Sequence, residues 1–229
     1  MGSEMCIRDR PNIFYFTGFP KGIGSLLMLR KGEGTELLVP LLDYERALSS
    51  VKSKDINIVP FSRYKVPDVD NVITDVLTYL KNKLSDTHKL GIDLGYVNSL
   101  IYNLIKSTNS DIIDLTSDIL SIRAIKDNYE IELITNALRI TEDALRKSIN
   151  ELRPNIAEAE FAGLLEMNMR FLGAEGFSFD TIVASGINSS YPHAIVSCKR
   201  ISEGEPIVCL LYTSPSPRDL STSRMPSSA

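Results

Sequence analysis

Two patterns of apolar and polar residues divide the chain, and one replaces the other close to residue 119. Before that point, short runs of branched and aromatic residues alternate with longer segments in which apolar residues recur every three or four positions. The first pattern is typical of buried strands and the second of amphipathic helices. Because a helix that connects two strands must cover a face of their sheet, the alternation predicts an α/β fold with a mixed sheet.

The elements expected in this first part follow from the same patterns. We expect strands at residues 12–20, 24–30, 35–40, 56–61, 89–94 and 111–116, and helices at 41–51, 68–86 and 97–108. Strands 24–30 and 35–40 are predicted to form a hairpin, because glycine-containing residues 31–34 separate them. Apolar residues are predicted to share one face of helix 68–86, namely Val72, Val76, Leu77, Leu80 and Leu84.

Helical spacing dominates after residue 119. Residues 121–152 predict a long helix, with an apolar face made of Ile131, Ile134, Leu138, Leu145, Ile149 and Leu152. Asp127 and Glu130 have the spacing of a capping box, in which each side chain accepts a hydrogen bond from the other residue's amide. This pair predicts a helix start inside the segment, and a change of domain is expected near residues 117–122.

A second helix and two strands are expected in the rest of the chain. Asn155 and Glu158 predict another helix start after Pro154, and Gly173 and Gly176 predict its end. A strand at 179–186, a polar loop at 187–194 and a strand that begins at 205 complete the pattern.

Composition narrows the class of protein. The 229 residues are 43% hydrophobic and 24% charged, which is ordinary for a globular protein. The formal net charge is -4, and the sequence has no run of Lys and Arg that could bind a nucleic-acid backbone. Since no apolar stretch approaches the roughly 20 residues of a membrane span and the start resembles no secretory signal, we expect no membrane association and a cytoplasmic location. Cys6, Cys198 and Cys209 lack the spacing of a disulfide framework or zinc site.

The two ends have an unusual relationship at the level of codons. "GSEMCIRD" can be written GGC TCG GAG ATG TGT ATA AGA GAC, and the reverse complement of that DNA encodes "LLYTSPS" in another frame. This resembles a sequencing-library adapter translated from both strands. We therefore expect residues 1–10 and 209–229 to be adapter-derived, with the serine- and proline-rich segment 209–229 disordered, and residues 11–208 to be the biological segment.

Two histidines are the first candidates for proton chemistry. His88 precedes strand 89–94 and is expected to face solvent. His193 lies in the polar loop after strand 179–186, a kind of position that often displays functional side chains. A loop histidine is more often structural than catalytic, so its position alone does not assign a role.

Three motifs bring a family into view. "FDTIVASGINSSYPHA" resembles the F-D-T-I-V-A-S-G-x-N-S-x-x-P-H-A segment of the pita-bread metallopeptidases, and "NIFYFTGF" resembles the N-x-x-Y-x-T-G-F opening of creatinase-type N-terminal domains. Arg123, Lys126, Glu130 and Ile131 match the family's R-x-x-K-x-x-x-E-I helix start. The resemblance covers residues 11–208 and points to Xaa-Pro dipeptidases (prolidases) and Xaa-Pro aminopeptidases. It implies a creatinase-type mixed-sheet domain at 11–119 and an incomplete α+β pita-bread domain at 120–208.

The resemblance also implies a chemistry and a site. The family hydrolyses the bond before proline with two divalent metal ions (Mn, Co or Zn), and by motif match His193 binds the peptide substrate and stabilises the tetrahedral intermediate. The five metal ligands lie after the strand that begins "EPIV", so the 229-residue chain is expected to hold no metal and to be inactive. Four other carboxylates match no ligand position: Asp93, Asp180, Glu203 and Glu205. The full-length protein is expected to form a homodimer.

Other residues near the motifs have two possible interpretations. Lys199 and Arg200 follow the histidine and could be either functional or part of a solvated turn. Phe177 and Phe179 could line a pocket for proline, although aromatic residues at such a junction are more often part of the core. Arg123, Lys126 and Glu130 are expected to be structural.

Two alternative functions remain open from the sequence. A creatinase-like hydrolase shares both domains and the loop histidine but cleaves a C–N bond without metal. A non-catalytic relative would use the same scaffold to bind histones or other peptides, which the retained P-H-A segment at His193 disfavours. Because an incomplete second domain leaves apolar faces without partners, the 229-residue chain is also expected to aggregate when it is expressed alone.

Overall fold

The structure, a computed structural model, describes residues 3–7, 10–20, 22–30, 34–64 and 71–213. The chain divides into two compact units, Met1–Ile125 and Lys126–Ala229. The division therefore lies a few residues beyond the boundary expected at residue 119. None of the helices within the described ranges is long and apolar enough to cross a membrane.

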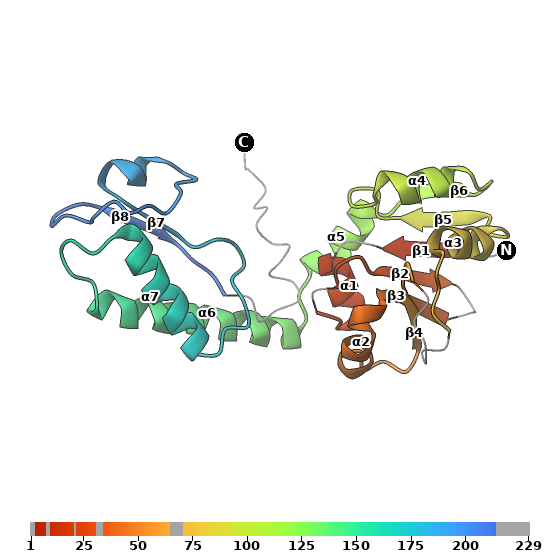
Figure 1. The fold of residues 1–229 in the computed structure, drawn as a ribbon, viewed down its shortest axis with the longest axis horizontal. Coiled ribbons are helices and arrows are strands. Elements are labelled where there is room, and N and C mark those ends of the chain that lie inside the picture. Colours follow the sequence, from red (N-terminus) through yellow and green to blue (C-terminus); the bar gives the residue numbers. More distant parts are fainter. Residues whose placement is uncertain (1–2, 8–9, 21, 31–33, 65–70, 214–229) are drawn as a thin grey trace. The chain divides into compact units, whose positions relative to one another are not determined.

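A mixed sheet forms the centre of the N-terminal unit (Figure 1). Its strands in the described residues are β1 (Ser3–Ile7), β2 (Leu26–Arg30), β3 (Gly34–Pro40), β4 (Ile56–Phe61), β5 (Lys89–Ile92) and β6 (Asp111–Asp114). Its helices are α1 (Arg10–Thr17), the 3-10 turn η1 (Leu41–Asp43), α2 (Tyr44–Ser50), α3 (Val76–Leu84), α4 (Ser99–Lys106) and α5 (Thr116–Ala124). The strand order is β4-β3-β2-β1-β5-β6, in which β2 is antiparallel to both neighbours and the other pairs are parallel. The predicted mixed α/β sheet is confirmed.

Helices cover both faces of this sheet (Figure 1). On one face, Leu80 of α3 and Ile105 of α4 pack over apolar residues of β2, β3 and β5. On the other face, Ile13 of α1, Ala47 of α2 and Ile119 of α5 pack over β2 and β3. Burial of the alternate side chains of each strand on opposite faces therefore holds two helical layers to one sheet.

The strand expected at residues 12–20 is wrong, because Arg10–Thr17 form helix α1. Its aromatic residues favour a strand by propensity, but that preference depends strongly on context. In the helix, Asn12 and Ile13 are both buried, and Thr17 Oγ1 donates a hydrogen bond to the Ile13 carbonyl oxygen. Gly18 ends the helix with a φ of 73°, in the left-handed region that glycine adopts without strain.

The helix expected at residues 68–86 is shorter in the structure, where α3 begins at Val76. The Asp75 side chain caps α3 by accepting hydrogen bonds from the Thr78 amide and hydroxyl. These bonds lower the pKa of Asp75, the hydroxyl contributing most. Leu80 and Leu84 are buried as predicted, whereas Leu77 is exposed. Residues 68–70 of the expected helix, like turn residues 31–33 of the hairpin, lie outside the described residues.

The C-terminal unit contains two helices and a two-stranded sheet (Figure 1). Its elements in the described residues are α6 (Asn128–Asn150), α7 (Glu158–Phe171), β7 (Ile182–Ser185), the 3-10 turn η2 (Gly186–Ser190) and β8 (Ile207–Leu210). Strands β7 and β8 are antiparallel, with Val183 opposite Cys209. Apolar residues of α7, β7 and β8 form one core with Ile156 and Ile201.

The long helix expected at 121–152 is two helices, α5 and α6, and the capping box predicted at Asp127 and Glu130 starts the second. The buried face of α6 differs from the predicted one, because Ile131, Leu138 and Ile149 are exposed. Small residues form its buried face instead, together with Glu130: Ala137, Thr141, Ala144 and Ser148. Since α6 packs against α7, these small side chains let the two helices approach closely.

Helix α7 begins two residues later than a cap at Asn155 predicts. Its N-cap is Ala157, whose amide donates a 3.3 Å hydrogen bond to Glu160 Oε2. Glu158 is consequently the first helical residue, and its side chain takes no part in the capping box. The predicted end is confirmed, because Gly173 follows the C-cap with a φ of 99°.

Both segments assigned to adapter sequence contain ordered residues. Ser3–Ile7 form β1, which pairs with β2 and β5. Strand β8 runs on to Leu210 and Thr213 is buried, which differs from the disorder expected from residue 209 onward. Residues 214–229 lie outside the described ranges. The origin of these segments in adapter DNA stays a prediction, since the structure of a protein does not show where the DNA that encodes it came from.

Candidate functional site

His193 lies on the loop between η2 and β8, where its side chain is exposed. It lines a groove with a volume of about 640 Å³ on the C-terminal unit. The other lining residues come from β7, from the turn before it, from the loop itself and from β8: Phe179, Asp180, Thr181, Ile182, Ala194, Ile195, Val196 and Leu210. The imidazole is thus set beside a largely apolar wall that one carboxylate, Asp180, interrupts.

This arrangement has clear chemical uses. An exposed imidazole can donate a hydrogen bond to a carbonyl oxygen. The apolar wall of Phe179, Ile195 and Leu210 can accept a small apolar ring. Phe179, one of the two aromatic residues that could line a pocket for proline, lines this groove. Phe177 does not line this groove; its ring lies under the Arg170 guanidinium, 4.7 Å from the ring centre, and packs on the α6–α7 core.

A buried carboxylate lies beneath the loop that carries His193. Glu158, at the first position of α7, is 0% exposed. Its Oε1 accepts hydrogen bonds from the Ser185 amide at 2.7 Å and from Ser185 Oγ at 2.9 Å. Its Oε2 accepts one from Ser197 Oγ at 2.6 Å, and Asn188 Nδ2 donates to both oxygens at 3.2 Å.

These hydrogen bonds decide the charge of Glu158. Burial raises the pKa of its carboxyl, but hydrogen bonds from Ser197, Ser185 and Asn188 oppose that effect, and the net result is a pKa lowered from the ordinary 4.5. The carboxylate is therefore ionised at neutral pH, and hydrogen-bond donors compensate for its burial.

Lys199 connects Ser185, a hydrogen-bond donor to Glu158, with Glu205 in the turn before β8. Its Nζ donates a 2.6 Å hydrogen bond to Glu205 Oε2 and a 3.0 Å hydrogen bond to Ser185 Oγ. The Lys199 ammonium is the main reason that the pKa of Glu205 is lowered. Lys199 therefore joins a side-chain network, whereas Arg200 points to a backbone oxygen, that of Asn155.

The remaining predicted residues lie away from the groove. His88 is exposed, as expected, in the N-terminal unit. Arg123 is buried there, and its Nη1 donates a 2.6 Å hydrogen bond to Asn12 Oδ1. Glu130 takes part in the capping box of α6, which agrees with its expected structural role.

The described residues do not fit a site for two metal ions. No three His, Cys, Asp or Glu side chains gather into a metal-binding cluster in the ranges that the structure describes. Two carboxylates near the loop already have partners, since Glu158 accepts a hydrogen bond from Ser197 and Glu205 accepts one from Lys199. We accordingly assign no metal ligand among them, and the expectation that the ligands lie outside this chain stays a prediction.

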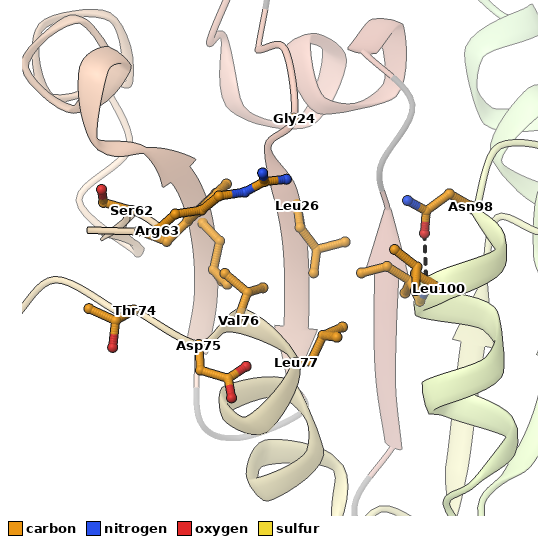
Figure 2. Close-up of a pocket in the computed structure, with 13 residues that line it drawn as sticks. Gly24, Leu26, Ser62, Arg63, Thr74, Asp75, Val76, Leu77, Asn98 and Leu100 are labelled. Carbon is orange, nitrogen blue, oxygen red and sulfur yellow. Dashed lines mark hydrogen bonds between the residues drawn. The ribbon is translucent and has the colours of Figure 1, made fainter. Parts of the chain in front are cut away.

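A second cavity, of about 320 Å³, lies in the N-terminal unit between the starts of α3 and α4 (Figure 2). Its lining is mostly apolar, from Leu26, Leu38 and Leu100 among others. The polar side chains Asp75 and Asn98 each cap a helix, and Figure 2 shows the hydrogen bond in which Asn98 Oδ1 accepts from the Ile101 amide. These polar groups serve the fold, so the groove at His193 is the stronger candidate.

Sequence reasoning singled out His193 as a candidate but did not point to the residues beneath its loop. Glu158 was expected to take part in a helix cap, and Ser185, Asn188 and Ser197 were seen only as members of a polar segment. A signal was nevertheless present, since three amide or hydroxyl side chains flank the histidine within a short segment. Only the fold shows that one distant carboxylate accepts hydrogen bonds from all three.

Comparisons with known proteins agree with this architecture. Residues 3–125 match the Creatinase/Prolidase N-terminal domain and residues 132–213 match Metallopeptidase family M24, so the matches extend past both expected adapter boundaries. A Xaa-Pro dipeptidase of Pyrococcus furiosus is 33% identical over 199 residues, which are 86% of this chain and 52% of that protein. The chain therefore spans about half the length of this curated relative.

Solved structures show the same fold. The X-Pro aminopeptidase from Thermotoga maritima has a TM-score of 0.75 at 28% identity, over 92% of this chain and 58% of that one. The prolidase from Pyrococcus furiosus has a TM-score of 0.73 at 31% identity, over 92% and 60% of the two chains. With a creatinase/prolidase domain match followed by an M24 match that contains the groove and His193, the chain belongs to the creatinase/prolidase family of pita-bread metallopeptidases.

Proposed function

We propose that this chain is the N-terminal part of a metal-dependent Xaa-Pro peptidase, which hydrolyses the peptide bond before proline. The observation that carries the proposal is the groove in which His193 of the P-H-A segment stands beside an apolar wall. Two kinds of relatives support it by their names, Xaa-Pro dipeptidase and X-Pro aminopeptidase. The proposed substrate is a peptide with proline in second position.

In this proposal the groove binds the proline side of the substrate. Phe179 and Ile195 contact the pyrrolidine ring, which is apolar and rigid and so loses little entropy on binding. The His193 imidazole donates a hydrogen bond to the carbonyl oxygen of the scissile peptide bond. This hydrogen bond becomes stronger as negative charge develops on the oxygen. Divalent Mn, Co or Zn ions would supply an activated water when bound, and we expect their ligands among residues other than those described.

The other expectations are proposals of the same kind. We place the longer protein in the cytoplasm and expect it to form a homodimer. The 229-residue chain is expected to be inactive, because the described residues supply no set of metal ligands. The choice between dipeptides and longer peptides depends on residues beyond this groove.

The test is to amplify the locus from intact genomic DNA and to express the continuous gene. Hydrolysis of Xaa-Pro peptides that depends on added Mn, Co or Zn, with no cleavage of matched Xaa-Ala peptides, is the expected result. His193→Ala should lower kcat by about 100-fold, in the range of one lost transition-state hydrogen bond. Metal-independent cleavage of creatine, or peptide binding without cleavage, would replace the proposal with one of the two alternative functions.

A further inference from the structure

We propose that Glu158 is a positioning residue for His193, a role that rests on the proposed function of the groove. Glu158 does not line the groove, and its carboxylate accepts hydrogen bonds from Ser185, Asn188 and Ser197, which lie outside the groove lining as well. It acts on the loop that carries the histidine, because its single carboxylate receives donors from both ends of that loop.

The geometry places the donors on either side of His193 in sequence. Ser185 ends β7 and Asn188 lies in η2, both before the histidine, whereas Ser197 lies after it. Since both flanks bond to the same carboxylate group, the separation of the loop ends is set by the size of that group. A loop whose ends are fixed in this way has fewer conformations available to its centre.

The carboxylate is itself held in place. Glu158 is fully buried, and its position at the first turn of α7 fixes its backbone. The Glu158 amide donates to the Lys199 carbonyl oxygen at 2.9 Å, and the Ala159 amide donates to the Ser197 carbonyl oxygen at 3.0 Å. The start of α7 therefore binds the downstream flank through its backbone as well as through the Glu158 side chain.

The charge of Glu158 gives these bonds their strength. A hydrogen bond to an ionised carboxylate is shorter and roughly twice as strong as a neutral one, and the 2.6 Å bond from Ser197 Oγ is of that kind. An amide in place of the carboxylate would keep the shape but would present a donor to groups that are themselves donors. The matched control is Glu160→Gln, which removes the same charge from the same helical turn but has its contact with the Ala157 amide rather than with the loop.

The first experiment measures loop order without any reference to activity. Amide hydrogen exchange of peptides that cover residues 186–197 is compared between the longer enzyme and its Glu158→Gln and Glu160→Gln variants. We expect exchange to become about tenfold faster or more in Glu158→Gln, with Glu160→Gln close to the parent. Equal exchange in all three would overturn the proposal.

The second experiment asks whether the loop acts through His193. In the longer enzyme, Glu158→Gln is expected to lower kcat about tenfold or more for Xaa-Pro peptides, but to add little in a His193→Ala background. A merely structural role would lower kcat by the same factor in both backgrounds, and that result would overturn the proposal. If Glu158→Gln does not fold, Ser197→Ala takes its place, with Ser190→Ala as control because Ser190 Oγ donates within its own turn, to the Ile187 oxygen.

The two experiments separate two kinds of failure. If the longer parent enzyme cleaves no Xaa-Pro peptide, the proposed function is wrong, and the positioning role in catalysis is overturned with it. If the parent is active and the double-variant cycle is additive, the function stands and the role of Glu158 is overturned.

Discussion

Asn12 Nδ2 donates a 2.7 Å hydrogen bond to Asp93 Oδ2, although the two residues are 81 positions apart. Arg123 Nη1 donates in turn to Asn12 Oδ1, so the buried Asn12 connects a guanidinium to a carboxylate. The three residues lie in α1, directly after β5 and in α5, and their chain of bonds joins α1 and α5 to the sheet of the N-terminal unit.

Arg123→Met should therefore destabilise the N-terminal unit. The substitution leaves the Asp93 carboxylate and the Asn12 amide oxygen buried without the guanidinium, which costs about 3–5 kcal/mol when one partner of a buried charged network is removed. Amide exchange of the sheet strands in increasing urea measures the effect. Lys54→Met, at an exposed position of the same unit, is the control and should change stability by less than about 0.5 kcal/mol.

Gly186→Ala should destabilise the C-terminal unit. Gly186 has a φ of 52°, and an added Cβ would lie 2.6 Å from Glu205 Oε1, close to the contact between Glu205 and Lys199. A loss of about 1–3 kcal/mol is expected from strain at a left-handed position. Gly163→Ala is the control, since Gly163 lies inside α7 with open space around its Cβ, and it should stabilise by about 0.5–1 kcal/mol. Thermal unfolding of the two variants should therefore shift in opposite directions.

Substitutions on α6 test which face is buried. Ala144 is fully buried where α6 packs against α7, so Ala144→Leu should cost about 1–3 kcal/mol through overpacking. Leu138, which the sequence pattern placed in the core, is exposed, and Leu138→Ala should cost less than about 0.5 kcal/mol. Amide exchange of α6 peptides in urea gives both values. A larger loss for Leu138→Ala than for Ala144→Leu would restore the face predicted from sequence.

Acid should loosen the C-terminal unit through Glu158. The folded pKa of this group is lowered from 4.5, so the native state binds its proton more weakly than the unfolded chain does. The stabilisation is complete above pH 4.5 and is lost as pH falls below that value through the folded pKa. Exchange protection of residues 186–197 should follow this course in the parent chain and become less pH-dependent in Glu158→Gln. Identical pH profiles would show that Glu158 does not control the loop.

The genomic continuation tests the assignment of the chain ends. An intact gene should encode residues after Val208 that differ from the present "CLLYTSPS" segment, and different residues before Pro11. Sequencing of the locus across both junctions is sufficient. Recovery of the same codons from intact genomic DNA would show that the adapter interpretation is wrong, without affecting the family assignment, which rests on residues inside both junctions as well.

The sequence by itself determined those features that depend on neighbours within about four positions. Alternation of strand and helix patterns predicted the mixed sheet, Asp127 with Glu130 predicted the start of α6, and Gly173 predicted the end of α7. These predictions succeed because periodicity and capping are local properties of the backbone. The motif around His193 placed the candidate site for a similar reason, since all its residues are contiguous.

The tertiary structure decided whatever depends on partners far along the chain. Aromatic residues favoured a strand at α1, but burial of Asn12 against Asp93 and of Ile13 against the sheet requires a helix. The small-residue face of α6 is buried because α7 packs there, and Glu158 binds the His193 loop because the start of α7 meets both its ends. Close packing and the need to pair buried polar groups select these contacts. A local sequence pattern predicts neither of them, because both involve residues far apart in the chain.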